Sequence, residues 1–190
     1  MLVSFPPTPT SSSPAILTIA CGDGQTIAIT TSGKVYGWGC YKDKEGKKFF
    51  HPSEGSSQIR RQQDTPLLLS GIESAIDVAC GSSFNLIRCE DGSLYSFGMS
   101  ECGELGRILP PVKRNEEYVE EDILKHYLTP GFMYTGLLTA SGSLVQATHP
   151  VRDAKAIGCG AYHSLVVVVN PLSSRHSYSH FDTFNLLNYS

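Results

Sequence analysis

The sequence lacks a long apolar run and any strong excess of charge. Its longest apolar stretch is the five residues from Leu165 to Val169, whereas a membrane-spanning helix needs about 20. The first residues also lack the basic start and apolar core of a secretory signal. Fifteen basic against eighteen acidic residues give a formal net charge of −3, which provides no overall attraction to nucleic acid. We therefore expect no membrane partner.

Recognised catalytic motifs are missing as well. The chain has no phosphate-binding Gly-x-x-x-x-Gly-Lys loop, no His-Glu-x-x-His and no Gly-x-Ser-x-Gly. Its six cysteines form no Cys-x-x-Cys pair, which argues against a structural zinc site and, without a signal, favours a reduced intracellular compartment. We predict no catalytic residue, metal, cofactor or small-molecule substrate, and the chain is not expected to be a hydrolase or other enzyme.

An internal repeat is the main feature that is present. Three glycines recur with the same separations of 11 and 17 residues in two copies, namely Gly22, Gly33 and Gly39, then Gly81, Gly92 and Gly98. A third copy begins around Gly160 and continues through Val167. The copies start 59 and then 79 residues apart, so we expect loops inserted between them.

Each copy predicts a small antiparallel sheet. An apolar strand ends at Cys-Gly, where we expect the glycine to bend the chain with a positive φ. A second apolar strand follows, then a Ser-Gly or Asp-Gly hairpin turn, then a third strand that ends at another glycine. Such a sheet must pack against its neighbours to bury both faces. We predict an all-β fold, a partial β-propeller of about three antiparallel blades, with an unrelated all-β sandwich as the alternative.

The composition divides the chain into three parts. Residues 1–15 are rich in Ser, Thr and Pro and are predicted to be disordered. Residues 16–170 form the partial propeller, and residues 171–190 a divergent C-terminal tail, since Pro171 stands where the third copy should have its turn glycine. We infer a truncated propeller, from an alternative or mistaken reading of its gene. Within the insert 107–129, the spacing of Val119, Ile123 and Tyr127 predicts a short helix that covers one end of the sheets.

These repeats resemble those of the regulator of chromosome condensation family. That family combines a glycine-ended inner strand, a glycine turn and an aromatic-glycine strand end. The stretch from Glu101 to Arg107 also resembles its Gly-x-Leu-Gly blade closure, and the likeness runs from about Ile16 to Asn170. The resemblance implies guanine nucleotide exchange on a small GTPase of the Ran type. It also implies a nuclear, chromatin-associated location, with the cytoplasm as the alternative, and histones or chromatin as further partners.

The resemblance also implies the binding residues. After the first copy, the family's exchange factor has a projecting wedge with an aromatic-basic-Asp-x-x-Gly pattern, which is matched by Tyr41, Lys42, Asp43, Lys44, Glu45 and Gly46. The wedge would press on the nucleotide site of the GTPase and weaken its phosphate and Mg²⁺ contacts. Asp23 and His163 match further residues of the binding surface. One position departs from the family, because Ser83 stands where a functional Asp is expected.

Each of these residues also has a plainer interpretation. Asp23 would serve as a turn residue whose carboxylate accepts nearby backbone N–H groups. The basic segment 42–61 would be a solvated loop that the fold tolerates, and His163 a structural histidine. The whole chain would then be a generic propeller-repeat interaction module without exchange activity.

An incomplete stack of blades leaves sheet faces and edges open, which favours association and lowers stability. We expect the chain on its own to unfold below about 60 °C, in the range of ordinary or weak mesophilic domains. Calorimetry combined with light scattering measures this. A monomer with a cooperative transition above about 60 °C would contradict the prediction.

Overall fold

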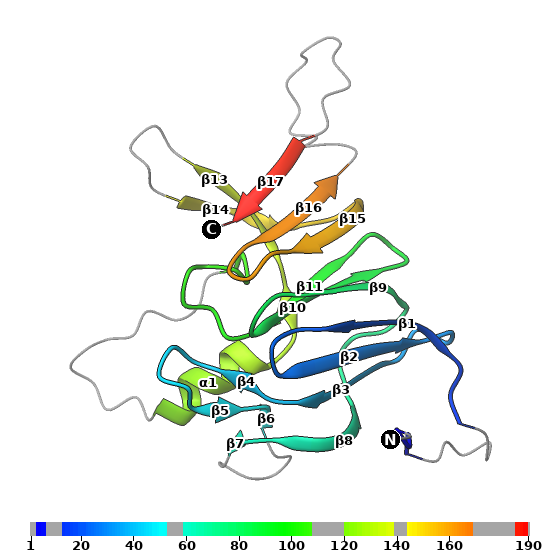
Figure 1. The fold of residues 1–190 in the computed structure, drawn as a ribbon. Coiled ribbons are helices and arrows are strands. Elements are labelled where there is room, and N and C mark those ends of the chain that lie inside the picture. The colour runs from blue at the N-terminus through cyan, green and yellow to red at the C-terminus, as the bar shows by residue number, and fades with distance from the viewer. Residues whose placement is uncertain are drawn as a thin grey trace.

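The repeats form three antiparallel sheets that stack one on another (Figure 1). The computed structural model describes residues 3–6, 13–52, 59–107, 120–138, 144–168 and 185–189. Within them the partial propeller of about three antiparallel blades is confirmed. The first strands of the three sheets are β1 (Ile16–Cys21), β9 (Ala75–Cys80) and β15 (Ala154–Cys159). β1 contacts β9, and β9 contacts β15, so these three strands form the inner row of the stack.

Blades 1 and 2 each have four strands and blade 3 has three. Blade 1 adds β2 (Gln25–Thr30), β3 (Val35–Gly39) and β8 (Gln63–Leu68). Blade 2 adds β10 (Phe84–Cys89), β11 (Leu94–Gly98) and β12 (Gly131–Phe132), and blade 3 adds β16 (Ser164–Val168) and β17 (Asn185–Tyr189). The fourth strands and β17 are not predicted by the repeat pattern. β17 pairs with β16, so the expected tail 171–190 contributes a strand to blade 3.

The inserts contain the remaining elements. After β3 come β4 (Tyr41–Lys42), β5 (Lys48–Phe49), β6 (His51–Pro52) and β7 (Ile59–Arg60). Between blades 2 and 3 come α1 (Glu120–Leu128), β13 (Tyr134–Leu138) and β14 (Leu144–Pro150). Among the described residues no helix has the length and apolar character needed to cross a membrane.

The three Cys-Gly motifs occupy equivalent places. Cys21, Cys80 and Cys159 each end the inner strand of their blade. At each one the glycine that follows donates its N–H to the carbonyl three residues later, at 2.9 Å. The next residues then link the blades, because the Asp23 N–H bonds the Ser82 carbonyl at 3.1 Å and the Ser82 N–H bonds the Ala161 carbonyl at 3.1 Å. The sheets are thus joined by backbone hydrogen bonds at one edge of the stack.

The glycine after each cysteine is needed for space and not for a positive φ. Gly22, Gly81 and Gly160 all have negative φ, so the expected left-handed bend is wrong. A Cβ at any of them would overlap the side chain three residues later, which is Gln25, Phe84 or His163. The left-handed conformation occurs instead in the hairpin turns, at Gly33 (φ 76°) and Gly92 (φ 79°).

Successive residues of β10 pack toward opposite neighbouring blades. In β10, Ile87 is fully buried in the core shared with Ile27, Ile29 and Val35 of blade 1. The adjacent Leu86, also fully buried, belongs to the core that includes Val166 of blade 3. This two-residue period is what a strand requires when both faces of its sheet are covered.

Among the described residues, no further blade covers the outer face of blade 1. Ile19 lies three residues before its strand-ending glycine, as Val78 does in blade 2, yet Ile19 is 57% exposed and Val78 only 8%. Part of this face is covered by Phe5, whose ring meets Tyr36 and Trp38 edge-on at 5.4 and 6.0 Å. The expected disorder of residues 1–15 therefore does not extend to Phe5, while residues 1–2 and 7–12 lie outside the described chain.

The predicted helix in the insert is confirmed as α1, which contacts β6, β7 and β11. Among its described side chains Leu124 and Leu128 are buried and Tyr127 is half-buried. The half-buried Arg107 closes the end of this helix, because its guanidinium donates to the carbonyls of His126 at 2.8 Å and Thr129 at 2.9 Å. Burial lowers the pKa of Arg107 to about 10.

Packing between blades predicts unequal effects at two isoleucines. Ile87→Ala should lower the free energy of unfolding by about 2–5 kcal/mol, because it opens a cavity between blades 1 and 2. The matched control Ile19→Ala should change it by no more than about 0.5 kcal/mol, since that side chain is already in contact with solvent. Urea denaturation followed by circular dichroism measures both values, and equal effects would contradict the stacking.

Candidate functional site

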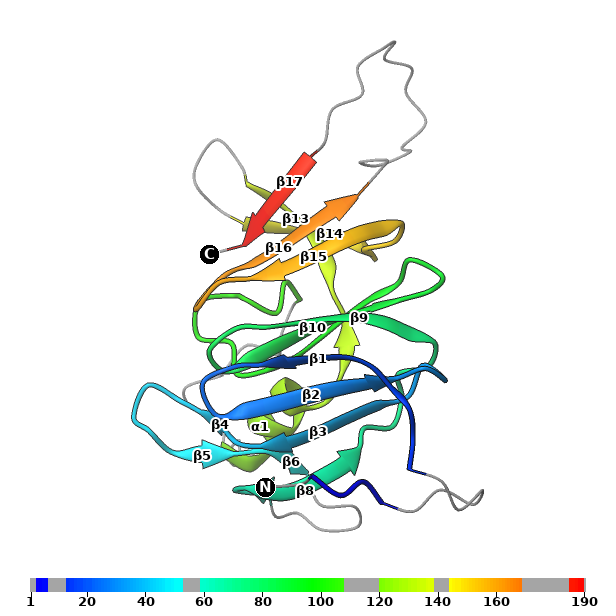
Figure 2. The same ribbon diagram turned by 45° about the vertical axis from the view of Figure 1, so that its right-hand side comes forward.

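The residues predicted from the wedge, the first inner strand and the third copy lie at one edge of the stack. Strands in each blade are antiparallel, so the β1–β2, β3–β4 and β15–β16 connections all emerge on the same side (Figure 2). The Cys40 N–H bonds the Gly24 carbonyl at 2.9 Å and holds the first two connections together. This edge therefore brings Asp23, the segment 41–46 and His163 to a common side.

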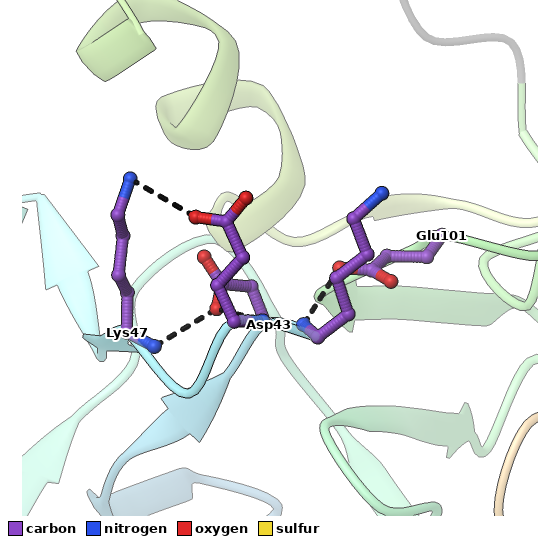
Figure 3. Close-up of polar contacts among 5 residues, drawn as sticks. Asp43, Lys47 and Glu101 are labelled. Atoms are coloured by element: carbon purple, nitrogen blue, oxygen red, sulfur yellow. Dashed lines mark hydrogen bonds and ion pairs between the residues drawn. The ribbon is translucent and has the colours of Figure 1, made fainter.

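The wedge segment is an ordered hairpin. Tyr41 pairs with Phe49 and Lys42 with Lys48 in the β4–β5 ladder, and we call residues 41–49 the wedge hairpin. Its turn is closed by Asp43, whose carboxylate accepts the N–H groups of Glu45 at 2.9 Å and Lys47 at 2.8 Å (Figure 3). Gly46 takes φ 80° in this turn, a conformation that a side chain would strain.

The wedge hairpin is also attached to blade 2. The Lys42 N–H donates to the Ser83 hydroxyl at 3.1 Å, and the Lys44 N–H donates to the Glu101 carboxylate at 2.9 Å. Ser83 is the residue that departs from the family pattern, and here it accepts a hydrogen bond from the wedge hairpin. The segment 42–61, which sequence alone left open as a solvated loop, is thus held by specific contacts at its start.

Tyr41 differs from the other wedge residues because its side chain is in the core. It is 1% exposed and stacks on Phe50 with ring centres 5.8 Å apart. Its hydroxyl accepts a hydrogen bond from the Asn85 side-chain amide at 2.9 Å. Burial raises the pKa of Tyr41 far above its usual value, so the phenol stays neutral. The expected partner contact of Tyr41 is corrected on this point, because the ring supports the base of the wedge hairpin from inside.

The charged side chains of the wedge hairpin face solvent. Lys42, Lys44 and Glu45 are exposed, and the Glu45 carboxylate lies 3.5 Å from the Lys47 ammonium. Among the described residues the ammonium groups of Lys42 and Lys44 have no hydrogen-bond or ion-pair partner. Four lysines against two acids in the hairpin make this part of the edge locally basic, although the chain as a whole is acidic.

Asp23 and His163 lie at the two ends of the backbone-linked edge. The exposed Asp23 carboxylate accepts no hydrogen bond from the described residues. The backbone N–H of Asp23 donates to the Ser82 carbonyl. The proposed turn role for that carboxylate therefore finds no support. His163 is exposed, and its ring lies over Gly160. It is thus both packed against the turn and open to a partner.

Burial suppresses thiolate formation at three of the six cysteines, Cys80, Cys89 and Cys159. All six are free. Burial raises the pKa of Cys159 to about 12 and that of Cys89 to about 11, and it raises the pKa of Cys80 further. These thiols stay protonated at neutral pH, and only a thiolate attacks. Within the described ranges, no three His, Cys, Asp or Glu side chains are grouped to hold a metal ion.

Four residues that organise the site are not indicated by the repeat pattern. They are Gln25, Ser83, Asn85 and Glu101. The Gln25 amide donates to the Gly81 carbonyl at 3.0 Å, which links the first two blades. A usable signal exists for two of them. Gln25 and Asn85 are buried polar residues that stand near the starts of the second strands, shortly before the apolar residues at their centres.

Comparison with known proteins identifies related chains. The family model described as "Regulator of chromosome condensation (RCC1) repeat" matches residues 16–41 and 75–104. The mouse protein named "Regulator of chromosome condensation" is 30% identical over 95 residues, which cover 49% of this chain and 21% of that protein. Human "E3 ubiquitin-protein ligase HERC2" is 35% identical over 96 residues, covering 48% of this chain and 2% of the ligase. This chain therefore spans only a small part of each relative.

A solved structure has the same fold. The crystal structure of Prp20p from Saccharomyces cerevisiae, a protein with binding properties to Gsp1p and histones, superposes with a TM-score of 0.50. It is 19% identical, and the match covers 80% of this chain and 41% of that one. This likeness agrees with the stack of propeller blades.

The buried hydroxyl of Tyr41 generates a prediction about stability. Tyr41→Phe should lower the free energy of unfolding by about 1–3 kcal/mol, because the Asn85 amide loses its acceptor while it remains buried. The control Tyr162→Phe should have almost no effect, since Tyr162 is 64% exposed. Chemical denaturation of the two variants distinguishes a supporting Tyr41 from one that serves only at the surface.

Proposed function

This chain is built from repeats of the regulator of chromosome condensation family, and we propose that it acts as a guanine nucleotide exchange factor-like protein on the small GTPase Ran. The observation that carries the proposal is the wedge hairpin. It is closed by Asp43, supported from below by Tyr41 and tied to blade 2 by Ser83 and Glu101. A projecting element that is held at its base in this way can displace a loop of a partner.

Exchange of this kind is a difference between binding free energies. A factor that binds the nucleotide-free GTPase more tightly than the loaded form shifts the population toward release. The shift equals the differential affinity and cannot exceed it. A preformed hairpin favours this outcome, since little ordering free energy is lost when it binds.

The exposed charges suggest how the edge would act. The exposed ammonium groups of Lys42 and Lys44 are suited to acidic side chains or phosphate oxygens of the GTPase. The exposed carboxylate of Asp23 is suited to a basic group next to them, and His163 would extend the contact along the edge. Asp43, Glu45 and Gly46 would set the shape of the tip. No bond is made or broken in this process, so we propose a binding function without enzymatic chemistry.

Further partners and the location follow by analogy. Prp20p has binding properties to Gsp1p and histones. We propose that a protein containing this chain acts in the nucleus at chromatin, with histones as additional partners and the cytoplasm as the alternative location.

A second candidate function is that of an interaction module without exchange activity. The observation that favours it is Ser83, because its hydroxyl stands at the position of an expected acidic residue and is engaged by the Lys42 N–H. The same repeats also occur in a relative named as a ubiquitin ligase. The stack of blades would then serve only to present the edge to a partner.

A nucleotide-release assay tests the proposal. Ran loaded with a fluorescent GDP analogue is mixed with the whole chain and excess unlabelled nucleotide. We expect release to be accelerated, and we expect Asp23→Ala or the pair Lys42→Glu and Lys44→Glu to reduce the accelerated rate about tenfold or more, as loss of ~1.4 kcal/mol or more would.

Lys34→Glu is the matched control. Lys34 is also an exposed lysine next to a turn, but it lies at the opposite edge of blade 1. It should leave the rate unchanged. If the wild-type chain binds Ran but release stays at the intrinsic rate, exchange activity is ruled out and the interaction module is supported.

A further inference from the structure

We propose that Glu101 is a positioning residue for the wedge hairpin, holding an element of blade 1 in its working orientation from blade 2. The inference rests on the proposed exchange function. The Glu101 carboxylate accepts the Lys44 N–H at 2.9 Å, in the turn of the wedge hairpin (Figure 3). The start of the segment 101–107 therefore has a role in addition to closing the blade.

The bond between Lys44 and Glu101 holds the turn of the hairpin, which lies outside the β4–β5 ladder. The β4–β5 ladder pairs only Tyr41 with Phe49 and Lys42 with Lys48. Beyond it, the Asp43 carboxylate ties the turn to itself through Glu45 and Lys47. Those bonds fix the internal shape of the turn but not its direction relative to the blades. Glu101 supplies a bond from outside the hairpin.

Glu101 is itself carried by a rigid base. Next along the chain, the Cys102 N–H donates to the Glu104 carboxylate at 2.9 Å. Leu105 is fully buried, and its carbonyl accepts the Ser96 hydroxyl at 2.7 Å. Glu104 is 4% exposed, and its carbonyl accepts the Ser164 hydroxyl of blade 3 at 2.7 Å. The carboxylate that holds the wedge hairpin is therefore connected to the cores of two blades.

A second bond acts on the same edge of the hairpin. The Lys42 N–H donates to the Ser83 hydroxyl at 3.1 Å. Ser83 directly precedes β10 and Glu101 lies shortly after β11. Both bonds therefore connect the hairpin to blade 2. A bond to a carboxylate is also stronger than one between neutral groups, which makes Glu101 the stronger of the two attachments.

Loss of the Glu101 carboxylate should make the orientation of the wedge hairpin relative to the blades variable without unfolding the hairpin. The hairpin would then sample orientations that do not engage the nucleotide site, and the maximal exchange rate would fall. Binding through Asp23 and His163 would be affected less. The expected signature is a lower maximal rate of nucleotide release, with a half-saturating concentration that changes less than the rate.

Amide hydrogen exchange on the whole chain tests the positioning without any GTPase. In Glu101→Ala we expect the amides of residues 42–47 to exchange about tenfold faster, a ratio that corresponds to ~1.4 kcal/mol. In Glu101→Gln the amide oxygen still accepts the Lys44 N–H, so protection should be largely retained. Glu90→Ala removes an exposed carboxylate from the opposite edge and should change nothing in this segment.

The same variants are then compared in the nucleotide-release assay. Slower maximal release by Glu101→Ala, restored in Glu101→Gln, supports the proposal. Unchanged protection of residues 42–47 in Glu101→Ala overturns it, and so does loss of protection in Glu101→Gln as large as in Glu101→Ala. If the wild-type chain fails to accelerate release, the exchange function fails, while the protection data still decide whether Glu101 holds the hairpin.

Discussion

Burial of both faces of every blade is the constraint on which the structure depends. A sheet of three or four short strands has two apolar faces and cannot bury either of them by itself. It must therefore lie between neighbouring sheets. Blade 2 meets this need fully, with Ile87 facing one neighbour and Leu86 the other. Backbone hydrogen bonds from Asp23 to Ser82 and from Ser82 to Ala161 align the three blades with one another at the same edge.

That constraint also determines where a partner can be engaged. A blade that lies between two neighbours leaves its edges free, and one edge of the stack gathers the turns that follow the inner strands. The wedge hairpin begins at this edge and gains its support from the next blade, through Asn85 below Tyr41 and through Glu101 at the turn. Support of the hairpin thus depends on the same packing of blade 1 against blade 2 that buries their shared core.

The repeat spacing was enough to predict the blades and their inner strands, because glycines at fixed separations indicate turns and close contacts that side chains cannot replace. The fourth strands β8 and β12 escape such a pattern, since they come from inserts of unequal length. The burial of Tyr41 could not be read from the wedge motif, because an aromatic residue in a basic loop is compatible with either side of a surface. The hydrogen bonds of Ser83 and Glu101 depend on residues that are 41 and 57 positions from their partners, and no local pattern connects such distant groups.

The glycine after each inner strand has a consequence for how such an edge can vary. Because it has no side chain, it leaves room for the side chain three residues later, which is Gln25, Phe84 or His163. Side chains of very different polarity are thus accommodated by one backbone. Gln25 and Phe84 are each 1% exposed, whereas His163 is exposed. The same backbone position therefore fills the interior in two blades and presents a side chain to solvent in the third.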